Sequence, residues 1–428
     1  MGKYSFKYGK EKLSAEIKDS SVIHTLLPKD AEIINDIKSQ VIRVLDNPVG
    51  TKSLKEIVSP GEKVAIVVSD ITRLWIKTNE FLVHIVNYLS KVGIEDNDMF
   101  VVVALGGHRK CTDDEMISIV GEEIYGRLKV YNHECEDLKE LVYIGESTRK
   151  TPIYLNKRVH EANRVILTGG IVFHLFAGFG GGAKAILPGV VGLKTIQANH
   201  SMCFNKGISA GMNMDVGSNL VKGNPVREDM NEVCKIVNPD FLFNVSLDIE
   251  GNFVKFVGGH YEKAWLEGCE LIRNLYGVPI QSEADIIIAS AGGYPKDINL
   301  YQTIKTVENA IYGGKEGSVL ILLSECIEGL GADEFAGWFK YKTLEEMEAA
   351  LKQNFTVPRF IAYKVAFTSV HRKVILISSL DDDLVKEFNM IPCHDLEEGI
   401  NMAYDLCGCD KPKITLMPYG GNTLPISI

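Results

Sequence analysis

The apolar residues of the N-terminal half gather into short continuous runs, each followed by glycine or a polar residue. The clearest runs are Val64–Ser69, Phe100–Leu105 and Val165–Thr168. Continuous rather than alternating apolar runs are typical of strands that are covered on both faces. Helical periodicity separates them, over Asn79–Val92 and Asp114–Leu128. Strands and helices in alternation predict an α/β fold with a mostly parallel sheet.

The same pattern returns in the C-terminal part of the chain. Apolar runs at Ala284–Ser290, Val319–Ser324 and Val374–Ser378 are again separated by helix-like sequence. A helix expected over Tyr261–Tyr276 ends at Gly277, which suits a domain boundary. A second α/β domain is therefore expected to follow this boundary.

We therefore expect two α/β domains with mostly parallel sheets. Residues 1–277 would form the N-terminal domain and residues 278–411 a smaller C-terminal one. The last apolar run, Ile414–Met417, lies in the tail 412–428, which is a candidate to return to the first domain.

Composition narrows the function classes. The chain has 428 residues with 46 Lys and Arg against 56 Asp and Glu, a formal net charge of −10, which argues against a nucleic-acid binder. No segment reaches the roughly 18 uninterrupted apolar residues that cross a bilayer, and the N-terminus lacks the apolar core of a signal peptide. Nine cysteines without a CxxC pair indicate no disulfide framework. We expect a cytoplasmic protein that contacts neither nucleic acid nor membrane.

Polar residues follow the three N-terminal runs directly. The first run leads into Asp70-Ile71-Thr72-Arg73, the second into Gly106-Gly107-His108-Arg109, and the third through Gly169-Gly170 to His174. Ligands of open α/β sheets bind outside the carboxyl ends of the strands. Each of these residues alone is more often solvated or a helix cap. Their shared position favours a site.

A glycine-rich segment, Gly178–Lys184, is the densest feature of the sequence. Gly180, Gly181 and Gly182 permit positive φ and can turn backbone N–H groups toward an anion, although a flexible loop is the plain alternative. The segment fits neither a P-loop nor a complete dinucleotide fingerprint. Lys184 is thus available as a point charge on phosphate or as a nucleophile joined to a cofactor.

Two further positions are candidates for the same ligand. Pro188-Gly189 breaks the chain between Lys184 and His200, so that both side chains can reach one ligand; otherwise His200 is a helix C-terminal residue favoured by the helix dipole. Gln302 and Lys305 are three residues apart and share a helix face that suits a carboxylate. Periodicity alone favours an exposed helix surface for that pair.

Together these residues resemble the lactate racemase family. The resemblance rests on Asp70–Arg73, Gly106–Arg109, the block from Gly169 through His174 and Lys184 to His200, and Gly292-Gly-Tyr-Pro with Tyr301-Gln302-x-x-Lys305. It covers most of the chain. It implies a racemase or epimerase of short 2-hydroxy acids, with two α/β domains and the active site in the cleft between them.

The family uses a nickel-pincer nucleotide, a pyridinium mononucleotide whose sulfur groups hold nickel. The resemblance implies that Lys184 joins this cofactor through a thioamide and that His200 is a protein ligand of nickel. It implies that His108 and His174 are the acid/base pair on the two faces of the substrate. The pyridinium would take the C2 hydrogen as hydride, with a 2-oxo acid as the intermediate.

The remaining roles are implied in the same way. Asp70, Ile71, Thr72 and Arg73 would contact the nucleotide, with Gly180, Gly181 and Gly182 beside it. Arg73 would also hold the substrate carboxylate as a bidentate pair. Tyr301, Gln302 and Lys305 would reach the substrate from the second domain. Enzymes that make the cofactor are the expected partners.

The sequence departs from the family pattern after Arg73, where Leu74-Trp75 replaces proline and small residues. A large aromatic side chain there reshapes the pocket, so malate and 2-hydroxyglutarate stand beside lactate as candidate substrates, with Lys296 and Arg359 as spare cations. A nicotinamide-dependent 2-hydroxy acid dehydrogenase is the alternative enzyme, but a ribose-binding acidic residue is missing. A non-catalytic nucleotide- or metal-binding regulator is the third hypothesis, and the presence of both His108 and His174 argues against it.

Overall fold

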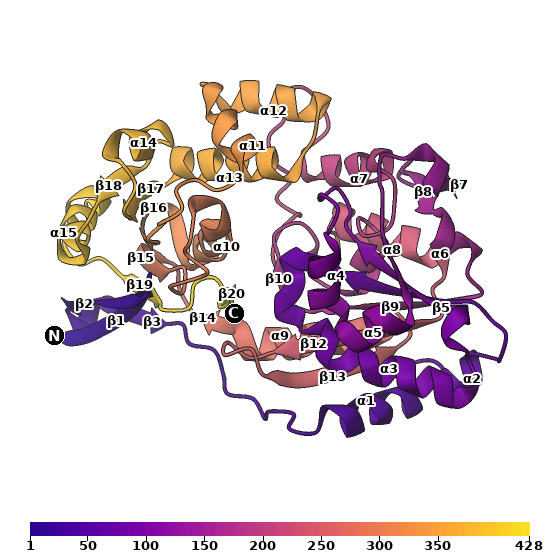
Figure 1. Cartoon of the computed structure of the whole chain (residues 1–428). Coiled ribbons are helices and arrows are strands. Elements are labelled where there is room, and N and C mark those ends of the chain that lie inside the picture. Colours follow the sequence, from indigo (N-terminus) through magenta and orange to yellow (C-terminus); the bar gives the residue numbers. More distant parts are fainter. The chain divides into compact units, whose positions relative to one another are not determined.

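The computed structural model describes all 428 residues. The chain divides into two compact units (Figure 1). The larger unit comprises residues 30–204 and 212–273, and the smaller unit comprises residues 1–29, 205–211 and 274–428. The division lies at residues 273–274, close to the boundary expected at Gly277.

A six-stranded sheet forms the centre of the larger unit. Its strand order is β13-β12-β9-β4-β5-β6, and only the edge strand β13 runs antiparallel to its neighbour. The strands are β4 (Val64–Ser69), β5 (Met99–Ala104), β6 (Lys129–Asn132), β9 (Arg164–Gly170), β12 (Phe241–Leu247) and β13 (Phe253–Gly259). The apolar runs are buried as their composition predicts, because helices cover both faces of a parallel sheet. The expected fold class is confirmed.

Helices and short hairpins surround this sheet. The helices are α1 (Ile37–Asp46), α2 (Leu54–Ile57), α3 (Thr78–Val92), α4 (Asp113–Val120), α5 (Glu122–Arg127), α6 (Lys157–Glu161), α7 (Leu193–His200), α8 (Pro225–Val237) and α9 (Lys263–Tyr276). The hairpins are β7 (Leu141–Glu146) with β8 (Pro152–Asn156) and β10 (Phe173–His174) with β11 (Gly178–Phe179). Short 3₁₀ helices are η2 (Ile71–Ile76), η3 (Asp96–Asp98), η4 (Leu138–Glu140), η5 (Gly182–Ala185) and η6 (Ser201–Cys203). The single helix expected over Asp114–Leu128 is two helices, since Gly121 between them has a φ of 86°.

The smaller unit contains a second six-stranded sheet, which is entirely parallel, in the order β18-β17-β16-β15-β19-β3. Its strands are β3 (Val22–Thr25), β15 (Ala284–Ser290), β16 (Gly314–Leu323), β17 (Lys373–Ile377), β18 (Ile391–Cys393) and β19 (Ile414–Met417). Two strand pairs accompany it, β1 (Gly2–Tyr8) with β2 (Glu11–Ile17) and β14 (Gly277–Ile280) with β20 (Leu424–Ser427). The helices are α10 (Leu300–Ala310), α11 (Asp333–Ala336), α12 (Leu344–Gln353), α13 (Val357–His371), α14 (Asp382–Glu387) and α15 (Leu396–Cys407), with η1 (Asp19–Ser21), η7 (Ile311–Gly313) and η8 (Gly337–Lys340).

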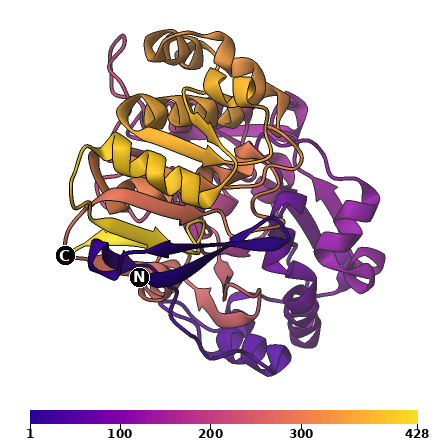
Figure 2. The same ribbon diagram turned by 90° about the vertical axis from the view of Figure 1, so that its left-hand side faces the viewer.

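Both ends of the chain differ from the expected domain division. Residues 1–29 belong to the smaller unit, and Figure 2 shows their β1–β2 hairpin in indigo. Phe6 and Ile17 of this hairpin are buried in the same core as the central strands. The tail also stays in the smaller unit, because β19 lies between β15 and β3 in its sheet. Strand partners are long-range contacts, so the apolar pattern of a short run does not identify its neighbour.

No helix of the structure combines the length and the apolar character needed to span a membrane.

Candidate active site

Asp70 and His108 meet at the carboxyl edge of the larger sheet. β4 and β5 are neighbours and end in register, with Ser69 opposite Ala104, so the residues that follow them emerge side by side. The Asp70 side chain is buried and accepts hydrogen bonds from His108 Nδ1 and, at 2.6 Å, from Thr72 Oγ1. Burial by itself would raise the pKa of the Asp70 carboxyl, but His108, Thr72 and Arg73 together hold it below its usual value.

The pairing with Asp70 orients the His108 ring. When Nδ1–H donates to a carboxylate, the neutral ring carries its lone pair on Nε2. The His108 side chain is 48% exposed, so this lone pair is not shut away in the core. His108 is thus arranged as a base with a buried carboxylate behind it.

The two arginines of these loops differ in their partners. Arg73 Nη1 donates to Thr72 Oγ1 at 3.1 Å and forms no ion pair with an acidic residue. Arg109 instead makes two hydrogen bonds to Glu115, at 2.6 and 2.8 Å, beside the N-terminus of α4. Ile71 packs against the apolar core. Of these side chains, Arg73 is the one with a guanidinium left for an anion.

His174 is the last residue of the strand β10, and its Nδ1 accepts hydrogen bonds, whereas Nδ1 of His108 donates one. Its Nδ1 accepts from the backbone N–H of Phe176 at 3.1 Å and of Ala177 at 3.4 Å. The neutral ring therefore carries its proton on Nε2. Burial lowers the pKa of His174 well below its usual value, and the charges of Lys184 and Arg73 lower it further.

The glycines of the Gly178–Lys184 loop are required by close packing against Trp265 and Asn244. A Cβ on Gly182 would lie 2.7 Å from the Trp265 ring, and one on Gly181 would lie 2.5 Å from Asn244 Oδ1. The N–H groups of Gly180 and Gly182 already donate to Val172 O and Asn244 Oδ1, each at 2.8 Å. Trp265 Nε1–H donates a hydrogen bond to Gly180 O at 2.7 Å. These N–H groups serve the loop itself.

Arg227 holds the same loop from behind and was not identified from the sequence. Its fully buried guanidinium donates to Ala177 O at 2.7 Å and to Phe179 O, and it stacks on Trp265 with 4.3 Å to the ring centroid. Burial lowers the pKa of Arg227 to about 10, so it stays charged at neutral pH. Asn224-Pro225 signals only a helix start, and an arginine in the first turn gives no local sign of being buried.

Lys184 is the central residue of this loop. It lies in η5, partly buried, and no acidic side chain pairs with it. Burial lowers the pKa of its amine well below the usual value, and Arg227 and Arg73 lower it further. The lowered pKa makes the neutral amine, which is the nucleophilic form, more readily available than it is in an exposed lysine.

His200 is the last residue of α7 and is 3% exposed. Its ring centroid lies 5.2 Å from that of Phe176, which in turn lies 6.0 Å from that of His174. Burial, with the nearby Lys184 charge, lowers the pKa of His200 to about 3. Asn199 anchors this end of α7, because its Nδ2 donates to Asp229 Oδ2 at 2.9 Å. No group of three or more His, Cys, Asp or Glu side chains in the chain is arranged as a metal site.

Two backbone approaches tie these loops together. Gly106 N–H, before His108, donates to Gly189 O at 3.0 Å, so the His108 turn rests on the Pro188-Gly189 turn that follows Lys184. The Trp75 ring lies against Gly170, where a Cβ would come within 2.8 Å of it. The larger unit therefore brings Asp70, Arg73, His108, His174, Lys184 and His200 to one region, on connected loops.

Tyr301, Gln302 and Lys305 lie on α10 of the smaller unit. Asn299 caps this helix by accepting from Gln302 N–H at 2.9 Å. Gln302 and Lys305 are exposed on one face, as their spacing predicts, while Tyr301 packs edge-on against Phe335 with 5.7 Å between ring centroids.

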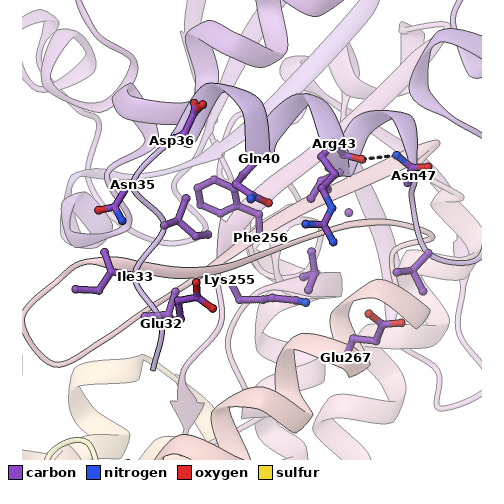
Figure 3. Close-up of a pocket in the computed structure, with 16 residues that line it drawn as sticks. Glu32, Ile33, Asn35, Asp36, Gln40, Arg43, Asn47, Lys255, Phe256 and Glu267 are labelled. Atoms are coloured by element: carbon purple, nitrogen blue, oxygen red, sulfur yellow. Dashed lines mark hydrogen bonds between the residues drawn. The ribbon is translucent and has the colours of Figure 1, made fainter. Parts of the chain in front are cut away.

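A hollow of about 590 Å³ lies elsewhere in the larger unit, between α1 and the edge strand β13 (Figure 3). Glu32, Arg43 and Lys255 are among its lining residues, and none of the expected site residues lines it. It lies along an edge of the sheet rather than at the carboxyl ends of the strands, so it is separate from the candidate site.

Family models and curated relatives match this chain along most of its length. The model of the lactate racemase N-terminal domain matches residues 8–211, and that of the lactate racemase C-terminal domain matches residues 280–424. The lactate racemase of Thermoanaerobacterium thermosaccharolyticum is 31% identical over 99% of both chains. The lactate racemase of Lactiplantibacillus plantarum is 30% identical over 96% of this chain and 97% of its own.

Solved structures show the same likeness. The lactate racemase apoprotein from T. thermosaccharolyticum superposes with a TM-score of 0.86 at 30% identity, covering 99% of this chain and 100% of its own. A crystal structure of a Thermotoga maritima protein shares the fold, with a TM-score of 0.61 at 17% identity over 94% of this chain and 100% of that one. Domain models, relatives along nearly the whole length and the shared fold agree, and the chain belongs to the lactate racemase family of isomerases.

Proposed function

We propose that this protein interconverts the enantiomers of lactate with a nickel-pincer nucleotide attached to Lys184. The observation that carries the proposal is Lys184 itself, a partly buried lysine with no acidic partner and a lowered pKa, in a loop held by Arg227 and Trp265. A lysine kept only for stability would ordinarily pair with a carboxylate. The likeness to proteins named lactate racemase supports the reaction type.

The residues present fit the cofactor. Lys184 would hold it covalently, since its amine is free to form a thioamide. His200 would bind the nickel, because a buried imidazole that stays neutral suits Ni(II). When bound, the cofactor supplies an acceptor for the C2 hydrogen of the substrate and returns that hydrogen to either face. The enzymes that make the cofactor are the partners this proposal requires.

His108 and His174 handle the hydroxyl proton in this proposal. His108 Nε2 presents a lone pair, and Asp70 stabilises the imidazolium that forms when it accepts the proton. His174 presents Nε2–H, because its Nδ1 accepts two backbone N–H bonds. Each ring must take up and release a proton in a complete cycle, so His174 has to weaken these bonds whenever it accepts one.

Arg73 holds the substrate carboxylate, and its neighbours favour a small substrate. Its guanidinium forms no ion pair with an acidic side chain of the protein, and a guanidinium readily forms a bidentate pair with a carboxylate. Trp75, two residues after Arg73 in the same loop, packs against Gly170. The two cations considered for a second carboxylate already have partners. Lys296 donates a hydrogen bond to Asn422 at 2.8 Å, and Arg359 forms an ion pair with Glu334 at 3.0 Å. Lactate therefore suits the site better than malate or 2-hydroxyglutarate, with Tyr301, Gln302 and Lys305 as further substrate contacts.

Peptide mass spectrometry tests the proposal directly. The chain is expressed with the cofactor-making enzymes, and we expect the peptide containing Lys184 to carry the cofactor mass, with about one nickel per active chain. Lys184→Arg is the matched variant, because it keeps a cation but cannot form the thioamide. It should carry no adduct. Unmodified Lys184 in a fully active sample would refute the attachment.

The fate of the C2 hydrogen tests the reaction. Racemisation of lactate in D₂O should leave C2 largely unlabelled if that hydrogen travels as hydride, while the histidines exchange only the hydroxyl proton with solvent. Incorporation of deuterium at C2 at the rate of racemisation would instead assign proton abstraction and a carbanion.

A further inference from the structure

A short loop of the chain crosses from one unit to the other just after His200. Residues 205–211, here called the strap, belong to the smaller unit, whereas the residues on both sides of them belong to the larger unit. In Figure 1 the strap is the magenta loop beside α12. The strap is largely exposed, and Ile208, its one large apolar side chain, is 94% exposed. Apolar burial of that side chain does not hold the strap in place.

Two charged side chains of α12 hold the strap instead. Glu348 Oε1 accepts from Ala210 N–H and Oε2 from Gly211 N–H, each at 3.0 Å. Lys352 Nζ donates to Gly207 O at 2.6 Å and to Asn205 O at 3.3 Å, and it pairs with Glu348 one turn away. Hydrogen bonds with one charged partner are roughly twice as strong as neutral ones.

The Glu348 carboxylate depends on these contacts. Glu348 is 2% exposed, and burial of a carboxylate that has no hydrogen-bond partners costs much free energy. Its hydrogen-bond partners are the two strap N–H groups and Lys352 of its own helix. Exposed acidic residues of α12 such as Glu345 make no such contact with the strap, which makes Glu345 a matched control on the same helix.

The strap is joined to His200 through a narrow neck. Phe204 pairs with Met212 as an antiparallel bridge, and Asn213 N–H donates to Cys203 O at 2.8 Å. Cys203 and Phe204 are buried. The neck continues directly into η6, which begins at Ser201, the residue after His200. Contiguous hydrogen-bonded chain therefore connects α12 with the end of α7.

We infer that Glu348 and Lys352 are positioning residues for His200: by fixing the strap to α12 they restrain the chain that follows the nickel ligand. This inference rests on the proposed role of His200 and adds that the smaller unit, through α12, contributes to how firmly nickel is held. Neither side chain touches the substrate or the metal in this inference. Their effect passes through the strap and its neck.

The first test needs no cofactor. In the full-length apoprotein, Glu348→Ala should speed amide hydrogen exchange at Ala210 and Gly211 by at least about tenfold, because both N–H groups lose a charged acceptor. Trypsin cleavage after Lys206 should accelerate in parallel. Glu345→Gln should change neither rate. Unchanged exchange in Glu348→Ala would overturn the anchoring role.

The second test measures nickel retention in the holoprotein. Challenge with a chelator should release nickel several-fold faster from Glu348→Ala and Lys352→Met than from Glu345→Gln and the unaltered chain. Glu348→Gln, which keeps the shape and one acceptor oxygen, should lie between them and serves if the alanine variant does not fold. Faster strap exchange with unchanged nickel release would overturn the positioning role.

His200→Ala separates this inference from the proposed function. If His200→Ala loses nickel while the α12 variants retain it normally, the proposed metal ligand stands and the strap inference fails. If His200→Ala keeps its nickel, the proposed ligand itself is wrong and the strap inference falls with it.

Discussion

The carboxyl edges of the two six-stranded sheets both carry polar residues, but the polar residues of the two edges have different roles. In the smaller unit, the polar groups after β15 and β16 are bound by the protein itself. Asp297, 1% exposed, accepts from Gly9 N–H at 2.6 Å and from Glu325 N–H at 3.3 Å. Ser324 pairs with Thr303 at 2.6 Å, and Ser290 donates to Lys7 O. Backbone and hydroxyl partners satisfy these three side chains, so they stabilise the fold.

The corresponding edge of the larger unit is short of partners of opposite charge. Lys184 and Arg73 form no ion pair with an acidic side chain, and the charges of Lys184, Arg73 and Arg227 lower the pKa of His174. The position of a residue at the carboxyl ends of parallel strands therefore does not by itself mark a site. What distinguishes the two edges is whether the polar groups there are already satisfied.

Lys184 should give the largest effect. Lys184→Ala should lower racemisation of lactate by at least about 10³-fold, because the cofactor carries the chemical step and loses its attachment. The stability of the apoprotein should stay the same or rise, since a cation without an acidic partner is removed. Chiral product analysis with urea unfolding measures both. Substantial activity, or a large loss of stability, would place Lys184 among the structural residues.

The histidine pair should give the next largest effect. His108→Asn and His174→Asn should each reduce racemisation in both directions by about 10²–10⁴-fold, the usual contribution of a positioned acid or base. The mass of the Lys184 peptide should be unchanged in both variants. The enantiomers of lactate are equal in free energy, so no variant can catalyse racemisation in one direction only. If the initial rates of the two directions fall by different factors, a step other than proton transfer is affected.

An Asp297 variant tests whether the hydrogen-bonded polar residues at the carboxyl edge of the smaller unit's sheet serve stability. Asp297→Ala should lower the free energy of unfolding by about 2–4 kcal/mol, because it leaves the N–H groups of Gly9 and Glu325 without their acceptor. Activity per folded molecule should remain. Urea denaturation with racemisation assays of the folded fraction gives both values. A fully stable but inactive Asp297→Ala would mean that this edge also carries function.

His133 tests whether burial alone marks a site in the larger unit. It is 1% exposed, and both ring nitrogens are engaged, Nε2 with Val191 O at 2.9 Å and Nδ1 with Asn156 Nδ2 at 3.1 Å. Burial lowers its pKa to about 4, so the unfolded chain binds the proton more readily than the folded one. Stability should therefore fall as the pH drops from about 6.5 towards 4, by about 2–3 kcal/mol in total. His133→Gln should flatten this dependence in urea unfolding while activity at neutral pH is kept.

Lys296 should give the smallest effect. Its hydrogen bond to Asn422 joins the loops after β15 and β19 on an exposed surface. Lys296→Met should change stability by about 0–1 kcal/mol and leave lactate kinetics unaltered. A marked rise in KM for lactate would show instead that this cation takes part in substrate binding.

The sequence predicted what depends on local pattern. Val64–Ser69, Ala284–Ser290 and Ile414–Met417 are strands with the expected bounds, since continuous apolar runs ended by polar residues fold in the same way in most contexts. The sequence also predicted that Asp70, His108 and His174 lie at one edge of the sheet, because the carboxyl ends of parallel strands share an edge. The prediction of one helix over Asp114–Leu128 was wrong because Gly121 interrupts it with a positive φ.

Contacts between distant parts of the chain were decided by the tertiary structure alone. The sequence determined two α/β units, the strand-end residues and the lysine of the glycine loop. Only the folded chain showed that β1, β2 and β3 belong to the smaller unit, that Arg227 and Trp265 hold the Lys184 loop, and that Glu348 holds the strap. The physical reason is that local periodicity specifies an element, whereas the partner of a buried arginine, a carboxylate or an edge strand is chosen by packing and hydrogen bonding across the whole fold.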